Sequence, residues 1–283
     1  MLVPVAGGGQ ETLLSEVGFV LLPLFTTRDA CALRLVCREF LAAVSEHPWE
    51  DRRTVIKGSI AAWRACFPHA LCANVQQYDL VLGSSGTRER TAPVVDADFV
   101  HFEGLRELYM AGCSDVTDAA FAHLRDIHTL DMTCCDQPAI TDAAFVPLAG
   151  LQRLCIGSCS QASITDAALA PLRGIKLLNM SACMQFTDAA FAHLRGIHTL
   201  HMRSCDQPAI TDAAFAHLKG IHTLGMSGCG QATITGSTFS CLSGVSDLCI
   251  DGCSAAAIAA AQRLVLPVLP WGPMKDHLTQ EPR

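Results

Sequence analysis

The sequence predicts an α/β solenoid, in which strand and helix alternate along most of the chain, preceded by a small helical module. The pattern apolar-x-x-Leu-x-(Met/Ile)-x-x-Cys recurs seven times, and its starts, from Leu105 to Val245, lie 22 or 24 residues apart. A second string, Ile-Thr-Asp-Ala-Ala-Phe-x-x-Leu, follows the block in residues 140–148 and 210–218. Apolar residues make up 50% of the chain and charged residues 17%, which allows a sizeable buried core.

The N-terminal part of the chain does not share the repeat. Residues 1–10 are expected to be disordered, and residues 11–69 to form a helical module. Its first helix ends near Pro23, because proline cannot continue helical hydrogen bonding. The apolar face of this helix comprises Leu13, Leu14, Val17, Val20, Leu21 and Leu24. Thr26 and Asp29 predict a capping box for a second helix. That helix is expected to carry Leu33, Val36, Cys37, Phe40, Leu41 and Val44 at spacings of three and four. A third stretch holds Trp49, and a fourth spans residues 59–67 around Trp63.

Residues 70–104 are predicted to form an incomplete first repeat. The segment that starts at Val94 aligns with the one that starts at Val116, so it represents the helical half of a repeat. Its strand is expected over residues 71–75, separated from the helix by a polar loop over residues 83–90.

The seven complete blocks, residues 105–263, each predict one strand and one helix. In Leu-x-Met and Leu-x-Ile, alternate side chains point inward, which is the periodicity of a strand. Thr followed by Asp is typical of a helix N-terminus, where the hydroxyl caps an amide and the acid suits the macrodipole. One such unit cannot bury its own apolar face. We therefore expect the units to stack into a curved solenoid with parallel strands on the concave side and helices on the convex side.

The block resembles the cysteine-containing class of leucine-rich repeats, whose units span roughly 20–29 residues. The resemblance implies that the last position is a buried packing site; it is occupied here by Cys113, Cys135, Cys159, Cys183, Cys205, Cys229 and Cys253. A ladder of thiols about 4.8 Å apart could alternatively hold a metal. However, the sequence has no Cys-x-x-Cys pair and no Cys/His quartet, so no metal site is expected. The last helix lacks the Thr-Asp start, and residues 264–283 are predicted to form a C-terminal cap and a polar tail.

Compartment and charge narrow the possible partners. Residues 1–10 lack the basic start of a secretory signal, and no apolar run approaches the roughly 18 residues that cross a bilayer. We therefore expect the fifteen cysteines to be free thiols in a reducing, cytoplasmic or nuclear protein that does not enter a membrane. The net charge of −7 argues against a general binder of nucleic acid or of acidic membranes.

Three strings in the helical module resemble an F-box: Leu24-Phe-Thr-Thr-Arg-Asp29, Leu33-Arg-Leu-Val-Cys-Arg-Glu-Phe40 and Pro48-Trp49. An F-box followed by cysteine-containing repeats is the domain order of F-box/leucine-rich-repeat proteins. The resemblance implies a substrate-recognition subunit of a cullin-RING ubiquitin ligase of the Skp-cullin-F-box type. Such a subunit docks on a Skp-type adaptor and holds a target protein on its solenoid. The docking residues implied here are Leu21, Leu24, Leu35, Val36 and Trp49; alternatively, several of them only pack the helical bundle.

The strand pattern identifies the concave surface on which a target would bind. Residues that alternate with the buried Leu and Met or Ile are expected to point outward. The predicted target-binding residues are Tyr109, Asp131, Arg153, Asn179, His201 and Arg203. Tyr and Arg are frequent anchors of protein interfaces. The alternative is that these side chains are ordinary solvated surface.

The sequence contains no catalytic motif. Gly7-Gly-Gly9 lacks the Lys-Ser/Thr of a phosphate-binding loop. His128, His198 and His222 recur at a helix-to-strand loop position without a neighbouring nucleophile, and two stacked histidines do not make a metal site. We therefore predict a non-enzymatic protein without a cofactor. The rival to the ligase subunit is a protein-binding repeat scaffold whose N-terminal helices only cap the solenoid.

Overall fold

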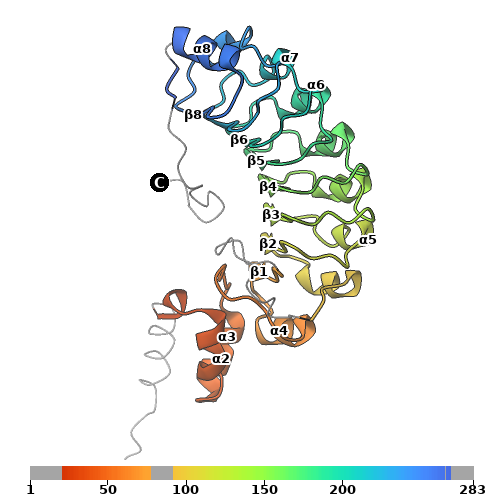
Figure 1. Ribbon diagram of the computed structural model, residues 1–283. Coiled ribbons are helices and arrows are strands. Elements are labelled where there is room, and N and C mark those ends of the chain that lie inside the picture. Colours follow the sequence, from red (N-terminus) through yellow and green to blue (C-terminus); the bar gives the residue numbers. More distant parts are fainter. Residues whose placement is uncertain (1–20, 78–91, 265, 269–283) are drawn as a thin grey trace, which may run out of the picture.

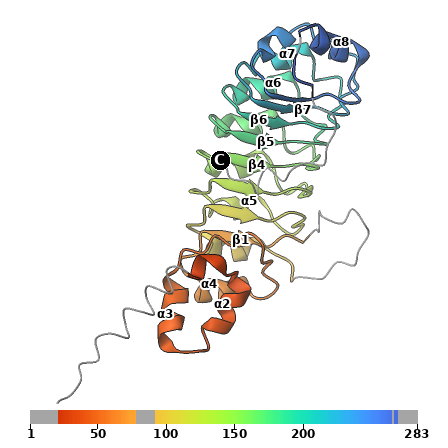
Figure 2. The ribbon, with the colours of Figure 1, turned by 90° about the vertical axis from the view of Figure 1, so that its left-hand side faces the viewer.

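The structure is a computed structural model that describes residues 21–77, 92–264 and 266–268. Its main body is a curved arc, with short parallel strands on the concave side and helical turns on the convex side (Figure 1). Eight strands form one sheet in chain order (Figure 2). They are β1 (Cys72–Asn74), β2 (Glu107–Tyr109), β3 (Thr129–Asp131), β4 (Arg153–Cys155), β5 (Leu177–Asn179), β6 (Thr199–His201), β7 (Thr223–Gly225) and β8 (Asp247–Cys249). The predicted α/β solenoid of leucine-rich-repeat type is confirmed.

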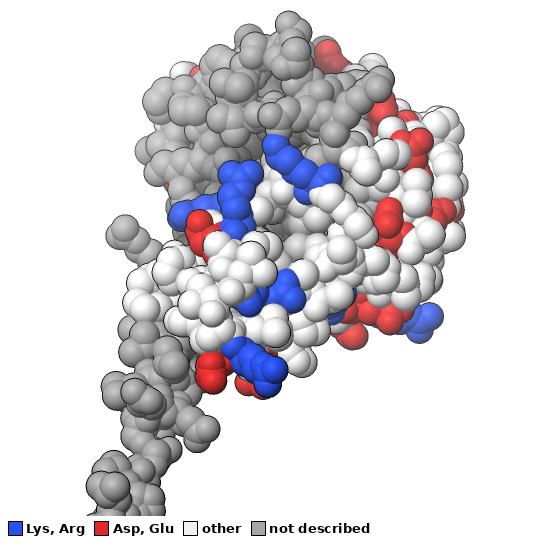
Figure 3. Space-filling view, turned by 90° about the horizontal axis from the view of Figure 1, so that it is seen from below, with Lys and Arg blue, Asp and Glu red and all other residues white. Residues whose placement is uncertain are grey.

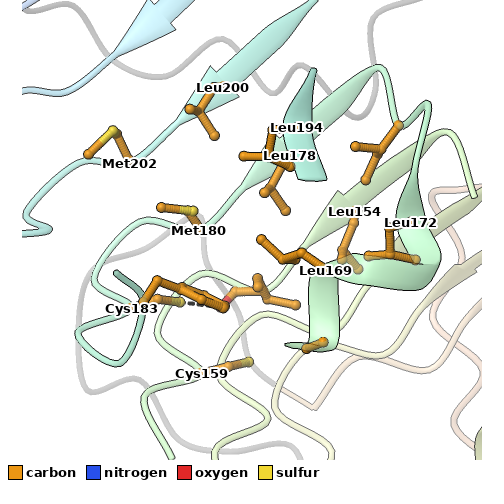
Figure 4. Close-up of a cluster of buried hydrophobic side chains, with 14 of the residues drawn as sticks. Leu154, Cys159, Leu169, Leu172, Leu178, Met180, Cys183, Leu194, Leu200 and Met202 are labelled. Atoms are coloured by element: carbon orange, nitrogen blue, oxygen red, sulfur yellow. Dashed lines mark hydrogen bonds between the residues drawn. The ribbon is translucent and has the colours of Figure 1, made fainter. Parts of the chain in front are cut away.

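The strands pair in a constant register because the sequence block is constant. The central leucines of neighbouring strands lie opposite one another. Examples are Leu154, Leu178 and Leu200 of β4, β5 and β6. All three are fully buried. Figure 4 shows this layer, with Met180, Cys159 and Cys183 on the side where the strands end. The core therefore runs the length of the arc as one continuous cluster.

The convex elements are shorter than typical helices. They are η2 (Asp96–Phe102), α5 (Asp118–Phe121), η3 (Asp142–Leu148), η4 (Asp166–Leu172), α6 (Asp188–Phe191), η5 (Ala192–Leu194), α7 (Asp212–Phe215), η6 (Phe239–Leu242) and α8 (Ala255–Arg263). Those labelled η are 3-10 helices. Pro147 in η3 and Pro171 in η4 lack the amide donor that an α-helix needs at that place. The repeats of α5, α6 and α7 carry His123, His193 and His217 at the equivalent position.

Neighbouring convex turns are joined by a ladder of Asp and Thr side chains, here called the Asp–Thr ladder. Its pairs are Asp96–Thr117, Asp118–Thr141, Asp142–Thr165, Asp166–Thr187, Asp188–Thr211 and Asp212–Thr235. In each pair the Thr amide and the Thr hydroxyl both donate to the carboxylate of the preceding repeat. In the Asp188 pair these distances are 2.7 and 2.6 Å. In five of the six pairs, all except that of Thr235, the Thr hydroxyl also caps its own helix, as predicted; Thr187 accepts from the amide of Ala189 at 3.2 Å. The sequence predicted only the local half of this arrangement.

The repeat cysteines form a second ladder beneath the strand ends. Each thiol donates to a backbone carbonyl of the preceding repeat; Cys183 Sγ lies 3.0 Å from the oxygen of Ile156 and Cys205 Sγ 3.2 Å from that of Met180. Both cysteines are fully buried. Buried Gln side chains continue this link, since Gln207 Nε2 donates to the carbonyls of Cys183 and Phe186. The predicted burial of the ladder cysteines is confirmed.

The helical module contains η1 (Leu22–Leu24), α2 (Thr27–Leu33), α3 (Arg38–Glu46) and α4 (Ile60–Cys66). The capping box of Thr26 and Asp29 is present at the start of α2. The prediction of one continuous second helix was wrong, because the chain turns between α2 and α3. Ala30 and Val44 belong to one small core with Trp49. A continuous helix would hold them about 21 Å apart at 1.5 Å per residue, so the break lets both reach that core.

Several predicted segments lie outside the described residues. They are residues 1–10, which were expected to be disordered, the part of the predicted first helix before Leu21, the predicted polar loop over residues 83–90 and the predicted tail beyond residue 268. Within the described ranges, no helix has the length and apolar character needed to cross a membrane.

The module is fixed to the first strands of the solenoid through α4 and the segment before it. Ile60 belongs to the solenoid core, and Trp63 packs against both cores. Arg52 forms a two-pronged ion pair with Glu107 of β2, with distances of 2.5 and 2.6 Å. Ile56 donates its amide to the carbonyl of Asn74 at 2.8 Å, so the segment before α4 pairs with the edge strand β1. This pairing covers the polar edge that β1 would otherwise expose.

Candidate functional site

An apolar group stands exposed on the helical module. Leu24 is 77% exposed, Leu35 88% and Val36 65%, and Leu21 is also exposed. Leu35 and Val36 lie in the turn between α2 and α3, where their amides donate to Ala32 and Leu33. The turn therefore directs two large apolar side chains into solvent. These four residues are accessible for docking, as the predicted adaptor contact requires.

Trp49 does not belong to this surface, which corrects its predicted role in adaptor binding. Its side chain is 1% exposed, and its Nε1 donates to the carbonyl of Val44 at 2.8 Å. Its ring meets that of Phe67 edge to face, with centroids 5.7 Å apart. A side chain held on both its polar and apolar sides packs the module core. The alternative reading, in which a docking candidate only packs the bundle, holds for Trp49.

A groove of about 940 Å³ lies at Leu24, one of these four exposed residues. It is lined by residues 22–26 of η1 and the turn after it, and by residues 47–53. Leu24 and Phe25 are apolar residues of the first lining segment, and Asp51 is an acidic residue of the second. The Asp51 carboxylate accepts the amide and the hydroxyl of Thr27 at 2.7 and 2.8 Å. Burial would raise the pKa of Asp51, but these bonds, with others from Thr54 and Arg53, hold it below its usual value.

The concave face offers fewer accessible side chains than predicted. Arg153, Asn179 and Arg203 are half-buried and accessible from this face. Tyr109, Asp131 and His201 are only 5%, 7% and 4% exposed, so their prediction as exposed target contacts was wrong. The side chains of one row lie only about 4.8 Å apart on neighbouring parallel strands and shield one another.

Local contacts add to this burial. The hydroxyl of Tyr109 donates to Glu107 at 3.1 Å, and burial followed by the charge of Glu107 raises the pKa of Tyr109 above its usual value. Asp131 accepts the hydroxyl of Thr133 at 2.6 Å. A Cβ atom on Gly225 would lie 2.8 Å from Nδ1 of His201, so the missing side chain makes room for this imidazole.

The repeat cysteines show no sign of reactive chemistry. Burial raises the pKa of Cys183 to about 12 and that of Cys205 to about 11, so both thiols stay protonated at neutral pH. Among the described residues, no group of three or more His, Cys, Asp or Glu side chains could hold a metal ion. The ladder is therefore suited to packing.

We expect iodoacetamide to modify the ladder cysteines only after unfolding. Under native conditions, mass spectrometry should find nine buried thiols unmodified: Cys72, Cys113, Cys135, Cys155, Cys159, Cys183, Cys205, Cys229 and Cys253. The exposed Cys31 should react first, and all fifteen should react in guanidinium chloride. Modification of Cys183 in the native protein as fast as that of Cys31 would show that the ladder is not closed.

In the repeats between residues 167 and 246, charge is divided between the two edges of the solenoid. Asp residues occupy the edge at which strands lead into helices, where the Asp–Thr ladder engages six of them. Seen from the end with the helical module, Lys and Arg side chains border the hollow of the arc, while acidic side chains lie along its outer side (Figure 3). Cations also gather where helices lead into strands. Sequence reasoning noted only histidines there, namely His128, His198 and His222. The basic residues are visible in the strings Arg173-Gly-Ile-Lys176, Arg195-Gly-Ile-His198 and Lys219-Gly-Ile-His222.

Comparisons with known proteins agree on the fold. No protein-family model matches the sequence, and no curated protein matches it. A chain in the crystal structure of the TLR13–ssRNA13 complex is similar, with a TM-score of 0.53 and 14% identity over 75% of this chain and 29% of that one. A chain of the glycosylated Toll–Spatzle complex from Drosophila has a TM-score of 0.53 and 12% identity over 81% of this chain and 34% of that one. A chain of the yeast Rad7–Elc1 complex has a TM-score of 0.41 and 20% identity over 51% of this chain and 42% of that one. This chain thus spans about a third of the first two, and its fold is a leucine-rich-repeat solenoid.

Proposed function

We propose that this protein is a non-catalytic substrate-recognition subunit of a Skp-cullin-F-box ubiquitin ligase. The observation that carries the proposal is the exposed apolar group of Leu24, Leu35 and Val36 on the helical module. Large apolar side chains left exposed on one small module favour a protein interface there, because leaving them in water forgoes the free energy of burial. The strings that hold these residues are those that resemble an F-box, and a Skp-type adaptor is the partner which that resemblance implies.

The rigid connection between module and solenoid suits this role. Trp63 packs against both cores, and the Arg52–Glu107 ion pair ties the module to β2. A target held on the solenoid would then take a set orientation to the adaptor and to the ligase beyond it. In such an assembly the recognition subunit contributes by proximity, and the ligase supplies the chemistry.

The concave face is the proposed target surface. Arg153 and Arg203 project half-buried guanidinium groups there, and Asn179 lies between their repeats. Partly buried Arg side chains are frequent anchors in protein interfaces, because they bring both apolar and hydrogen-bonding contacts.

A repeat scaffold without a ubiquitin role is the second candidate. It is favoured by α4, whose Ile60 and Trp63 cover the apolar end of the solenoid as a cap would. A cap alone, however, gives no role to the apolar side chains of Leu35 and Val36, which point away into solvent.

Binding to a purified Skp-type adaptor separates the two candidates. We expect the wild-type chain to co-purify with the adaptor and Leu35→Glu/Val36→Glu to lose this binding, because the contact would have to bury two carboxylates. The matched control is Val146→Glu. Val146 is 64% exposed on the convex side of the solenoid, so this variant should bind the adaptor as the wild type does. Circular dichroism should be unchanged in both variants. If the wild-type chain does not bind the adaptor, the ligase role is excluded and the scaffold stands.

A further inference from the structure

Three consecutive repeats present the same basic string where the helix leads into the strand. We call its residues the basic edge: Arg173, Lys176, Arg195, His198, Lys219 and His222. In each string a glycine with positive φ turns the chain between the two polar residues; Gly196 has φ 80°. The following isoleucine, such as Ile197, is buried and anchors the turn. The turn therefore places both polar side chains of each repeat at the same edge, and all six are exposed.

The backbone holds this edge in register. His198 donates its amide to the carbonyl of Lys176, and His222 donates to that of His198, both at 3.0 Å. These three residues therefore follow one another at the strand spacing of about 4.8 Å. The imidazoles of His198 and His222 are stacked, with ring centroids 4.7 Å apart and planes at 27°. The side chains thus form a row, which scattered surface charges would not.

The positive charge of this row is not neutralised within the described part of the chain. None of Arg173, Lys176, Arg195 and Lys219 forms an ion pair with a carboxylate there. The only acids between residues 167 and 246 are Asp188, Asp206 and Asp212, which follow strands and so lie at the opposite edge. Two of them are engaged by the Asp–Thr ladder. Like charges at this spacing repel one another, so an anionic partner would be attracted.

We propose that the basic edge binds a short, extended acidic segment of a partner polypeptide. The row from Lys176 to His222 spans two strand spacings, about 10 Å, which matches three or four extended residues. Single-stranded nucleic acid is recognised by aromatic stacking platforms, and the edge carries no Trp, Tyr or Phe. A duplex requires a broad positive surface, whereas this protein has a net charge of −7 and an acidic opposite edge. An extended acidic peptide needs neither aromatic stacking nor a broad positive surface, so it fits the basic edge. This binding does not require the module to dock an adaptor.

The test uses the full chain and a fluorescein-labelled peptide of six consecutive Glu residues, with a peptide of six Gln as the neutral comparison. We expect anisotropy to show binding of the Glu peptide that weakens as ionic strength rises. The triple variant Arg173→Gln/Arg195→Gln/Lys219→Gln should lower the affinity roughly tenfold, as loss of three exposed ion pairs implies. The matched control, Arg28→Gln/Arg53→Gln/Arg263→Gln, removes the same charge from exposed sites elsewhere and should bind as the wild type does.

Three results would overturn the proposal. In the first, the Glu peptide binds no better than the Gln peptide. In the second, both triple variants lose affinity equally, which would mean that the total charge of the protein, and not the basic edge, determines binding. Alternatively, an oligouridine of six nucleotides would bind more tightly than the Glu peptide, which would identify the edge as a nucleic-acid site. All substituted side chains are exposed, so we expect the variants to keep the fold, and circular dichroism checks that they do.

Discussion

Cys183→Arg is expected to destabilise the solenoid by about 4 kcal/mol or more, which is a large fraction of the stability of a typical domain. Cys183 is fully buried beneath the end of β5, and its thiol donates to the carbonyl of Ile156 at 3.0 Å. A guanidinium group there would be an unpaired charge in a core with no carboxylate. It would also be too large for the space, so the neighbouring repeats would have to separate.

Two further variants isolate the cause. Met184→Arg adds the same charge at the next residue, where the native side chain is 44% exposed, and should leave the melting temperature nearly unchanged. Cys183→Ser keeps a donor for Ile156 and should cost far less than the arginine. The readouts are the soluble fraction after expression and the thermal transition followed by far-UV circular dichroism. A soluble Cys183→Arg protein that melts as the wild type does would show that the ladder is not buried.

The solenoid was predictable because one strand-and-helix unit is written seven times. A single Leu-x-Met string is ambiguous, but seven copies at 22 or 24 residues define the strands and their parallel register. The Thr-Asp start likewise predicted the N-termini of α5, η3, η4, α6 and α7. What the repeat could not reveal is that Asp188 also binds Thr211, because that bond joins residues 23 apart across two units. The need for a partner in the next repeat appears only once the units are stacked.

Exposure at the candidate sites was less predictable. Leu35 and Trp49 both occur in strings that resemble an F-box, yet one is 88% exposed and the other 1%. Leu35 lies in the turn between α2 and α3, whereas the ring of Phe67 and the carbonyl of Val44 hold Trp49 in the module core. On the concave face, alternation predicted the direction of His201 but not its burial, which depends on its neighbours. Period determines the direction of a side chain, and tertiary neighbours determine its exposure.

A spine of large apolar side chains runs through the convex half of the core. Its members are Phe99, Phe121, Phe145, Leu169, Phe191, Phe215 and Phe239, all of them fully buried. The Phe215 ring meets that of Phe239 edge to face, with centroids 5.3 Å apart, and lies 6.4 Å from that of Phe191. One side chain therefore links three repeats. In a solenoid, where each repeat contacts only its neighbours, such a residue stabilises two interfaces at once.

Phe215→Ala should cost about 4 kcal/mol, from the cavity it leaves and the two ring contacts it removes. Leu169 holds the same place in its own repeat, so Phe215→Leu is accommodated by this architecture and should cost only about 1 kcal/mol. Urea unfolding followed by circular dichroism gives both values. Hydrogen exchange should place the loss of protection in α6, α7 and η6 and spare β2 and β3, because a one-dimensional array weakens first at the damaged interface. Equal loss of protection along the whole arc would instead mean that the repeats unfold as a single unit, and that the spine does not act repeat by repeat.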